Sequence, residues 1–200
     1  MTDVELETPH GPARAQLHAA AEPRAALVLG HGAGGGVGAR DLVAATREAL
    51  AAEVSVALVE QPYRVAGRRS PAPAPQLDAA WTAVVEQLRD GPLGGLPLIA
   101  GGRSAGARVA CRTAAATGAI GVLCLAFPLH PPGRPEKTRL AELEAVAVPV
   151  LIVQGERDPF GMPPAAPGRE VARIAGNHSL VSDIGALREA VAGWLAALLA

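Results

Sequence analysis

One serine of this chain lies in a pattern that suits a nucleophile. Residues 102–106 read GRSAG, a G-x-S-x-G motif, and they follow the apolar stretch Leu96–Ala100 and open a segment with helical character. A sharp turn from strand to helix lifts the hydroxyl of Ser104 clear of the sheet edge. Glycines flank it because any side chain there would collide with the crowded turn. The motif is short and built from common residues, so the assignment depends on partners elsewhere in the chain.

A serine hydroxyl needs a base, and the base needs a carboxylate to orient it. Asp158 lies in the loop GERDPFG after an apolar run, and His178 is the only histidine that follows it. The chain order Ser104, Asp158, His178 is the order found when the serine lies on a strand-to-helix turn. Glu156 is the alternative acid, closer to the strand. Taken singly, Asp158 could be a turn former and His178 a surface histidine; together they predict a nucleophilic triad that works by acyl transfer.

A glycine-rich stretch, LVLGHGAGGGVGAR (residues 27–40), permits two interpretations. Gly30, Gly32 and Gly35 spell G-x-G-x-x-G, the fingerprint of dinucleotide binding, and Glu60 at the end of the next strand could bind a ribose. The same stretch also matches an HGGG-type oxyanion loop. Both uses bring backbone N–H groups close to an anion, so the glycines alone do not separate the two interpretations.

The triad residues favour the oxyanion loop, because a dinucleotide site would leave them unexplained. In that case the N–H of Ala33, with Gly34 as the alternative, and the N–H of Ala105 bind the oxyanion. Further candidates for lining the site are His31, Gly34, Tyr63, Arg103 and His130. Arg103 has two interpretations, as a buried charge paired with a carboxylate or as a substrate-recognition residue. The cluster Arg64, Arg68 and Arg69 is either an attractor of anionic substrates or a solvated charge run.

Five short apolar runs alternate with segments of helical spacing, which predicts strands buried on both faces of a parallel sheet. The strands are expected at Ala25–Leu29, Val54–Val59, Leu96–Ala100, Ile120–Phe127 and Val148–Val153. Helical spacing is clearest over 77–88 and 184–198. The expected fold is therefore α/β, with a mostly parallel, twisted sheet and helices on both faces.

The first segment differs from the rest, because polar and apolar residues alternate on both sides of Gly11-Pro12. This pattern predicts an antiparallel hairpin at the sheet edge. No linker or repeat divides the chain, so residues 1–200 are expected to form a single domain. The segment 130–146 is too short for a helical lid, and the site should be open.

Composition excludes several functions. The 200 residues are 50% hydrophobic with a formal net charge of −1, which favours neither nucleic acid nor an anionic membrane as partner. The acidic start lacks the features of a secretory signal, so we expect a cytoplasmic protein with Cys111 and Cys124 as buried, reduced thiols. No spacing suits a zinc or calcium site, and no cofactor is expected. The oligomeric state is left open.

Several motifs resemble a known family. The stretches LVLGHGAGGG, GGRSAGARVA, AFPLHPPGRPEK, VPVLIVQGERDPFG and IAGNHSL are similar to a small lidless branch of the α/β hydrolases, related to dienelactone hydrolases, with eukaryotic relatives among testis-expressed and chromatin-complex proteins. The resemblance runs from residue 27 to the end and implies the α/β-hydrolase fold with Ser104, Asp158 and His178 as its triad. One feature departs from the family pattern: Asn177 precedes the histidine, where many relatives have a larger or acidic residue. Dienelactone hydrolases proper use cysteine as nucleophile, whereas this chain has Ser104.

The resulting expectation is a bacterial serine hydrolase that acts on a small acyl ester. The alternatives are a thioesterase or amidase with the same triad, or a non-catalytic interaction module that retains the fold. An intact triad argues against the interaction module, because a scaffold has no need of all three groups.

Overall fold

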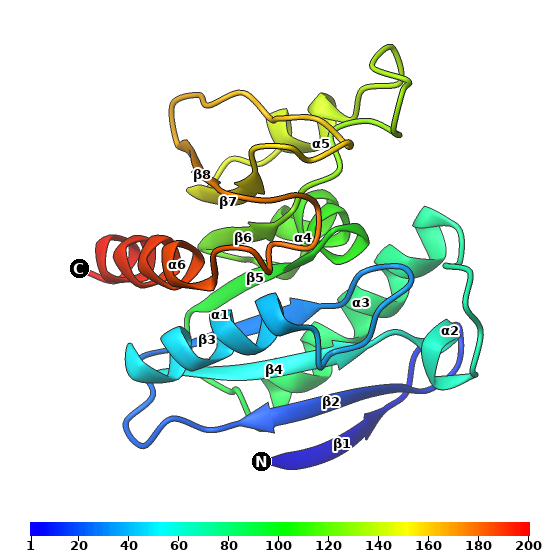
Figure 1. Cartoon of the computed structure of the whole chain (residues 1–200). Helices are drawn as coiled ribbons and strands as arrows, with labels where there is room; N and C mark the ends of the chain where they lie inside the picture. Colours follow the sequence, from blue (N-terminus) through cyan, green and yellow to red (C-terminus); the bar gives the residue numbers. More distant parts are fainter.

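The computed structural model describes residues 1–200 and contains one eight-stranded sheet with the strand order β1-β2-β4-β3-β5-β6-β7-β8 (Figure 1). From β4 across to β8 all neighbouring strands are parallel, which confirms the mostly parallel sheet predicted from the apolar runs. The strands are β1 (Thr2–Leu6), β2 (Ala13–His18), β3 (Ala25–Gly30), β4 (Val54–Glu60), β5 (Leu98–Arg103), β6 (Gly121–Leu125), β7 (Val150–Gly155) and β8 (Arg169–Ile174).

Helices cover both faces of the sheet (Figure 1). One apolar core joins α3, α4 and α5 to one face, and Trp81 and Phe127 are its largest fully buried side chains. A second core joins α1 and α6 to the other face. The helices are α1 (Arg40–Ala51), α2 (Pro62–Val65), α3 (Ala74–Asp90), α4 (Ala105–Thr117), α5 (Leu140–Glu144) and α6 (Ile184–Leu198). Because helices cover both faces of the central strands, the side chains on both faces are buried and these strands are apolar throughout.

The N-terminal hairpin is confirmed. β1 pairs antiparallel with β2, from Thr2 opposite Leu17 to Leu6 opposite Ala13, and forms one edge of the sheet. β2 in turn pairs antiparallel with β4. The alternating pattern arises because only one face of this edge meets the core, so Ala13 and Ala15 are buried while Arg14 between them is exposed.

Some strand limits differ from those expected. β5 begins at Leu98 rather than Leu96 and continues to Arg103, because Gly101 and Gly102 pair with β6 and keep the start of the motif inside the sheet. The expected strand Ile120–Phe127 ends at Leu125, since Ala126 adopts a positive φ of 52°.

Strand β8 was not expected from the sequence. Its residues are REVARI, and all but the last are only partly buried or exposed, because β8 lies at the sheet edge. An edge strand with charged side chains lacks the apolar run that marks the central strands.

Two further features concern the chain as a whole. Cys111 and Cys124 are buried and free, with their sulfurs 3.5 Å apart. The hydrogen bond between the two thiols and burial raise the pKa of the Cys124 thiol well above its ordinary value. None of the helices has both the length and the apolar character that crossing a bilayer requires. The sheet has no inserted lid, as expected.

Candidate active site

Ser104 occupies the tight turn between β5 and α4. Its backbone has φ 52° and ψ −107°, a strained conformation for a residue with a side chain. The flanking glycines make this turn possible: a Cβ on Gly102 would lie 2.6 Å from the Gly30 carbonyl oxygen, and one on Gly106 would overlap the same carbonyl. The turn therefore lifts Ser104 out of the sheet, which is the placement expected from the motif.

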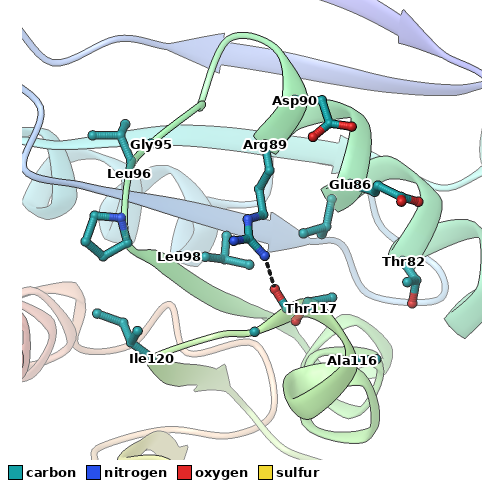
Figure 2. A pocket seen from close by; sticks show the side chains of 13 residues that line it. Thr82, Glu86, Arg89, Asp90, Gly95, Leu96, Leu98, Ala116, Thr117 and Ile120 are labelled. Atoms are coloured by element: carbon teal, nitrogen blue, oxygen red, sulfur yellow. Dashed lines mark hydrogen bonds between the residues drawn. The ribbon is translucent and has the colours of Figure 1, made fainter.

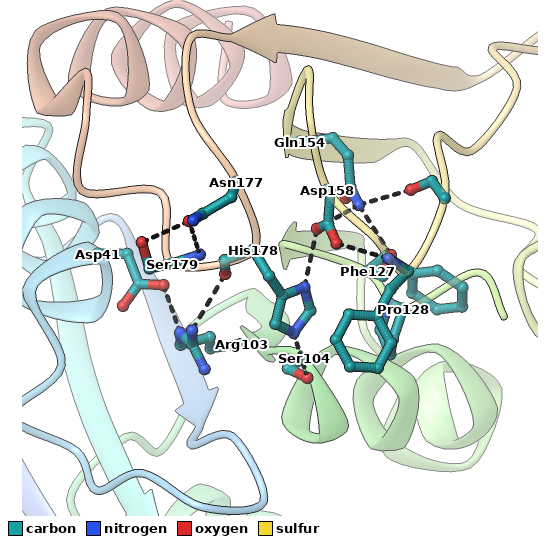
Figure 3. Close-up of polar contacts among 12 residues, drawn as sticks. Asp41, Arg103, Ser104, Phe127, Pro128, Gln154, Asp158, Asn177, His178 and Ser179 are labelled. Carbon is teal, nitrogen blue, oxygen red and sulfur yellow. Dashed lines mark hydrogen bonds and ion pairs between the residues drawn. The ribbon is translucent and has the colours of Figure 1, made fainter. Parts of the chain in front are cut away.

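The structure brings Ser104, His178 and Asp158 together (Figure 3). The His178 Nε2 atom lies 2.9 Å from Ser104 Oγ, and its Nδ1 atom lies 2.8 Å from Asp158 Oδ2. Each residue follows the carboxyl end of a different strand, namely β5, β7 and β8. A neutral imidazole that donates from Nδ1 to the carboxylate presents its free Nε2 lone pair to the serine hydroxyl.

The carboxylate of Asp158 is held rigidly, with only 1% of its side chain exposed. Its Oδ1 atom accepts a hydrogen bond from the Phe160 N–H at 2.9 Å. Its Oδ2 atom accepts one from the side-chain amide of Gln154 at 2.8 Å, in addition to the contact with His178. Glu156 lies two residues away, but its side chain is exposed and only its backbone N–H is bonded, to Ile174. The acid that reaches His178 is thus Asp158.

Gln154 is a residue that the sequence analysis missed. It is fully buried at the end of β7, and its amide nitrogen lies within hydrogen-bond distance of Phe127 O, Asp158 Oδ2 and Gly161 O. A lone polar residue near the end of an apolar strand, four positions before an acid, was the available signal. Because a buried amide needs hydrogen-bond partners, Gln154 holds the loop that contains Asp158 and Gly161, called the acid loop below.

The imidazole of His178 packs against the ring of Phe160, with ring centroids 4.2 Å apart. Its side chain is 18% exposed, so one part of the ring faces solvent and a substrate can approach. The backbone carbonyl of His178 accepts a hydrogen bond from Arg103 at 3.1 Å. His178 is therefore held through its ring and through its backbone.

The stretch 31–36 forms the loop after β3, next to Ser104. Gly32 packs against Arg103, whose Nη1 atom would lie 2.7 Å from a Cβ at that position. The carbonyl of Ala33 accepts a hydrogen bond from the Tyr63 hydroxyl at 3.1 Å. Ala105 begins α4, and the N–H groups of a first helical turn have no partner within the helix. A Cβ at Gly34 would meet nothing within 4 Å, so packing does not require glycine there.

His31 is buried behind this loop. Its Nε2 atom accepts from the Gln61 N–H at 3.1 Å, and its Nδ1 atom lies 2.8 Å from the Gly32 carbonyl oxygen. A neutral ring with its proton on Nδ1 satisfies both contacts, and burial lowers the pKa of His31. The ring thus links the residue that follows β4 to the loop 31–36. Tyr63 packs beside it, with ring centroids 5.7 Å apart, and burial raises the pKa of Tyr63.

This neutral, buried histidine predicts an acid-sensitive fold. In the unfolded chain His31 has its ordinary pKa of 6.5, whereas in the folded chain burial lowers this pKa. Its contribution to stability is therefore complete above pH 6.5 and is lost as the pH falls from there through the lowered pKa of the folded state, with a slope that one proton limits to about 1.4 kcal/mol per pH unit. Urea unfolding between pH 5 and 8 measures this slope. In His31→Gln the slope should be smaller, and an unchanged slope would contradict the prediction.

His130 and the arginine cluster make no hydrogen bond to Ser104, Asp158 or His178. The ring of His130 packs on Gly161 of the acid loop, its Nδ1 atom lies 2.9 Å from Pro131 O, and its backbone N–H donates to Phe160 O. Arg64, Arg68 and Arg69 belong to the segment that follows β4, where Arg68 and Arg69 are exposed and Arg64 donates to the Arg68 carbonyl. No carboxylate pairs with any of the three.

Arg103 is paired, in agreement with the first of its two interpretations. Its Nε atom donates to Asp41 Oδ2 at 2.7 Å, and only 1% of the Asp41 side chain is exposed. Burial raises the pKa of Asp41, and the Arg103 guanidinium opposes part of that rise. Asp41 lies 62 residues away along the chain, so no local pattern could identify it as the partner.

A surface hollow of about 720 Å³ lies at the opposite end of β5, away from the triad (Figure 2). It is lined by the ends of α3 and α4 and by Leu98, the first residue of the strand, and Arg89 crosses it to donate to Thr117 O. None of the predicted site residues reaches it. A much smaller hollow, of about 10 Å³, is lined by residues that include His31, Trp81 and Ala105.

Comparison with solved structures supports the fold. Est1E from Butyrivibrio proteoclasticus is 15% identical, with 99% of each chain covered and a TM-score of 0.80. A lidless α/β serine hydrolase from Xanthomonas campestris is 20% identical, with 96% of this chain and 94% of that chain covered and a TM-score of 0.71. Dienelactone hydrolase from Anabaena variabilis is 15% identical, with 98% and 94% covered and a TM-score of 0.76.

Comparison of the sequence with functionally curated proteins gives no significant match. The model of the family described as alpha/beta hydrolase domain, however, matches residues 23–180. This match spans most of the chain, including Ser104, Asp158 and His178. The strand order of the sheet and the absence of a lid agree with this match. This chain belongs to the α/β-hydrolase domain family.

Proposed function

We propose that the protein is a serine hydrolase that cleaves a small acyl ester. The observation that carries this proposal is the unbroken chain of contacts from Ser104 Oγ through His178 to the buried carboxylate of Asp158, at 2.9 and 2.8 Å. A strained serine turn adds to it, because strained backbone conformations cluster at functional sites.

The chemistry follows from these positions. Ser104 Oγ attacks the ester carbonyl carbon while His178 Nε2 takes the hydroxyl proton, and the negative charge of the tetrahedral intermediate rests on the N–H groups of Ala33 and Ala105. Collapse breaks the bond to the alcohol, which leaves with the proton from His178. Water then attacks the acyl-enzyme by the same route and releases the acid. Asp158 holds the imidazole and stabilises its charged form throughout.

The open site favours small substrates. The side chain of His178 is partly exposed, and no lid covers the loops around it. Est1E, which shares the fold, has a solved structure with ferulic acid bound, a small aromatic acid. A short or flat acyl group therefore fits this site better than a lipid does.

Labelling with a fluorophosphonate probe tests the proposal. The wild-type protein should bind one probe covalently, and peptide mapping should find it on Ser104, because phosphonylation needs a serine activated by its base. A panel of matched short esters, thioesters and amides then separates the ester hydrolase from a thioesterase or amidase. A folded wild-type protein that the probe does not label would contradict the proposal and favour a non-catalytic module.

A further inference from the structure

The guanidinium of Arg103 lies where three segments of the site meet (Figure 3). Its Nε atom donates to Asp41 at the start of α1, and its Nη2 atom donates to the backbone carbonyl of His178. Its Nη1 atom packs so closely on Gly32 that a Cβ there would lie 2.7 Å away. Arg103 also precedes Ser104 directly in the chain. One side chain therefore touches the base segment and the oxyanion loop from the residue next to the nucleophile.

Asp41 gives this guanidinium a fixed anchor. The Oδ1 atom of Asp41 accepts the N–H of Leu42 at 2.9 Å, so both carboxylate oxygens are bonded and the group is held in the first turn of α1. Burying a carboxylate together with a guanidinium costs solvation free energy. Well-packed apolar residues of similar volume commonly give equal or greater stability, so stability alone does not explain the pair. The pair leaves the other two guanidinium nitrogens of Arg103 directed at the His178 carbonyl and at Gly32, which points to a role in positioning these segments.

We propose that Arg103 is a positioning residue that, anchored on Asp41, holds the His178 segment and the Gly32 loop in place around Ser104. The inference rests on the proposed function of the same site. Arg103 does not touch the reacting atoms; it sets the distance between His178 Nε2 and Ser104 Oγ through the backbone of each. Because a misplacement of about 1 Å can cost roughly 100-fold in rate, a loose base segment lowers turnover without altering substrate affinity.

Arginine suits this position for a geometric reason. Its planar fork directs N–H groups to several sides at fixed angles, whereas the ammonium of lysine is a compact charge on a flexible stem. Lysine at 103 could keep the charge and the contact with Asp41 but could not also span to the His178 carbonyl in the same geometry. Arg103→Lys therefore removes the positioning contact and retains the ion pair.

The matched control is Arg108→Lys. Arg108 lies in α4, close to Arg103 in sequence but outside the site. It makes a bidentate ion pair with Glu142, with Nε 2.9 Å from Oε2 and Nη2 2.5 Å from Oε1. We expect Arg103→Lys to lower kcat and the rate of fluorophosphonate labelling by about 10- to 100-fold, with KM changed by less than about threefold. Arg108→Lys should leave both rates near wild type. All variants are assayed well below their midpoints of thermal unfolding.

Asp41→Asn gives an independent arm, because the asparagine keeps the shape and can still accept from Leu42. It should also lower the labelling rate. The labelling rate of the double variant Arg103→Lys/Asp41→Asn should be only slightly below that of Arg103→Lys alone, as expected for two residues that act through one contact network. If Arg103→Lys does not fold, the Asp41→Asn labelling rate decides the question.

Three outcomes would overturn the inference. A labelling rate of both Arg103→Lys and Asp41→Asn near wild type would show that the pair is structural only. A raised KM with unchanged kcat in Arg103→Lys would show that Arg103 binds substrate. Equal losses in Arg103→Lys and Arg108→Lys would point to general destabilisation. The proposed function fails separately, through a wild-type protein that is not labelled or a Ser104→Ala variant that keeps its activity.

Discussion

Ser104→Ala is expected to lower kcat by about 10⁶-fold, the loss measured when a triad serine is removed from a hydrolase of this mechanism. In the proposed mechanism this hydroxyl is the attacking group, and it is the group that forms a hydrogen bond with His178 Nε2. The rate that remains comes from the oxyanion hole and from substrate binding. Hydrolysis of an activated short ester, followed with purified protein, measures the effect. A variant that retains more than about a tenth of the activity would show that Ser104 is not the nucleophile.

The fold should survive this change. The Ser104 side chain makes one hydrogen bond, to His178, so its removal should alter the free energy of unfolding by no more than about 1 kcal/mol. Ser179→Ala is the matched control, because this exposed hydroxyl bonds only to Asn177 Oδ1, at 2.8 Å, beside the base. It should keep near wild-type activity. A comparable loss in both variants would mean that disturbing the loop, and not removing the nucleophile, causes the effect.

Asp158→Asn is expected to lower kcat by about 10⁴-fold. The Phe160 N–H needs an acceptor at Oδ1, so the new amide nitrogen must take the place of Oδ2 and point its N–H groups at His178 Nδ1. The imidazole then accepts at Nδ1 and carries its proton on Nε2, where it cannot take the proton of Ser104. The same amide also faces the N–H donor of Gln154, which adds to the loss.

Glu156→Gln provides the comparison for this acid. Its side chain is exposed, and the carboxylate that pairs with His178 is that of Asp158, so the change should cost less than about tenfold. Steady-state assays of the two variants with one ester, at equal protein concentration, give the ranking. A larger loss in Glu156→Gln than in Asp158→Asn would show that Glu156, and not Asp158, is the orienting acid.

Much of the fold follows from local patterns in the sequence. Apolar runs identified the central strands, the alternation around Gly11-Pro12 identified the hairpin, and the order Ser104, Asp158, His178 identified the three residues that the structure brings together. These predictions succeed because periodicity and turn chemistry act over a few residues, and the carboxyl ends of parallel strands meet at one edge of the sheet.

Only the tertiary structure revealed the contacts that support this constellation. Asp41 is 62 residues from Arg103, and the carbonyl that Arg103 holds is 75 residues away; neither distance leaves a local signal. The burial of His31, the amide of Gln154 beneath the acid and the edge strand β8 likewise depend on neighbours supplied by other elements. The sequence alone thus determined which residues could carry the chemistry, because their types and order follow from the reaction. Which groups hold them was decided by packing, because a hydrogen bond between distant residues exists only after the sheet has assembled.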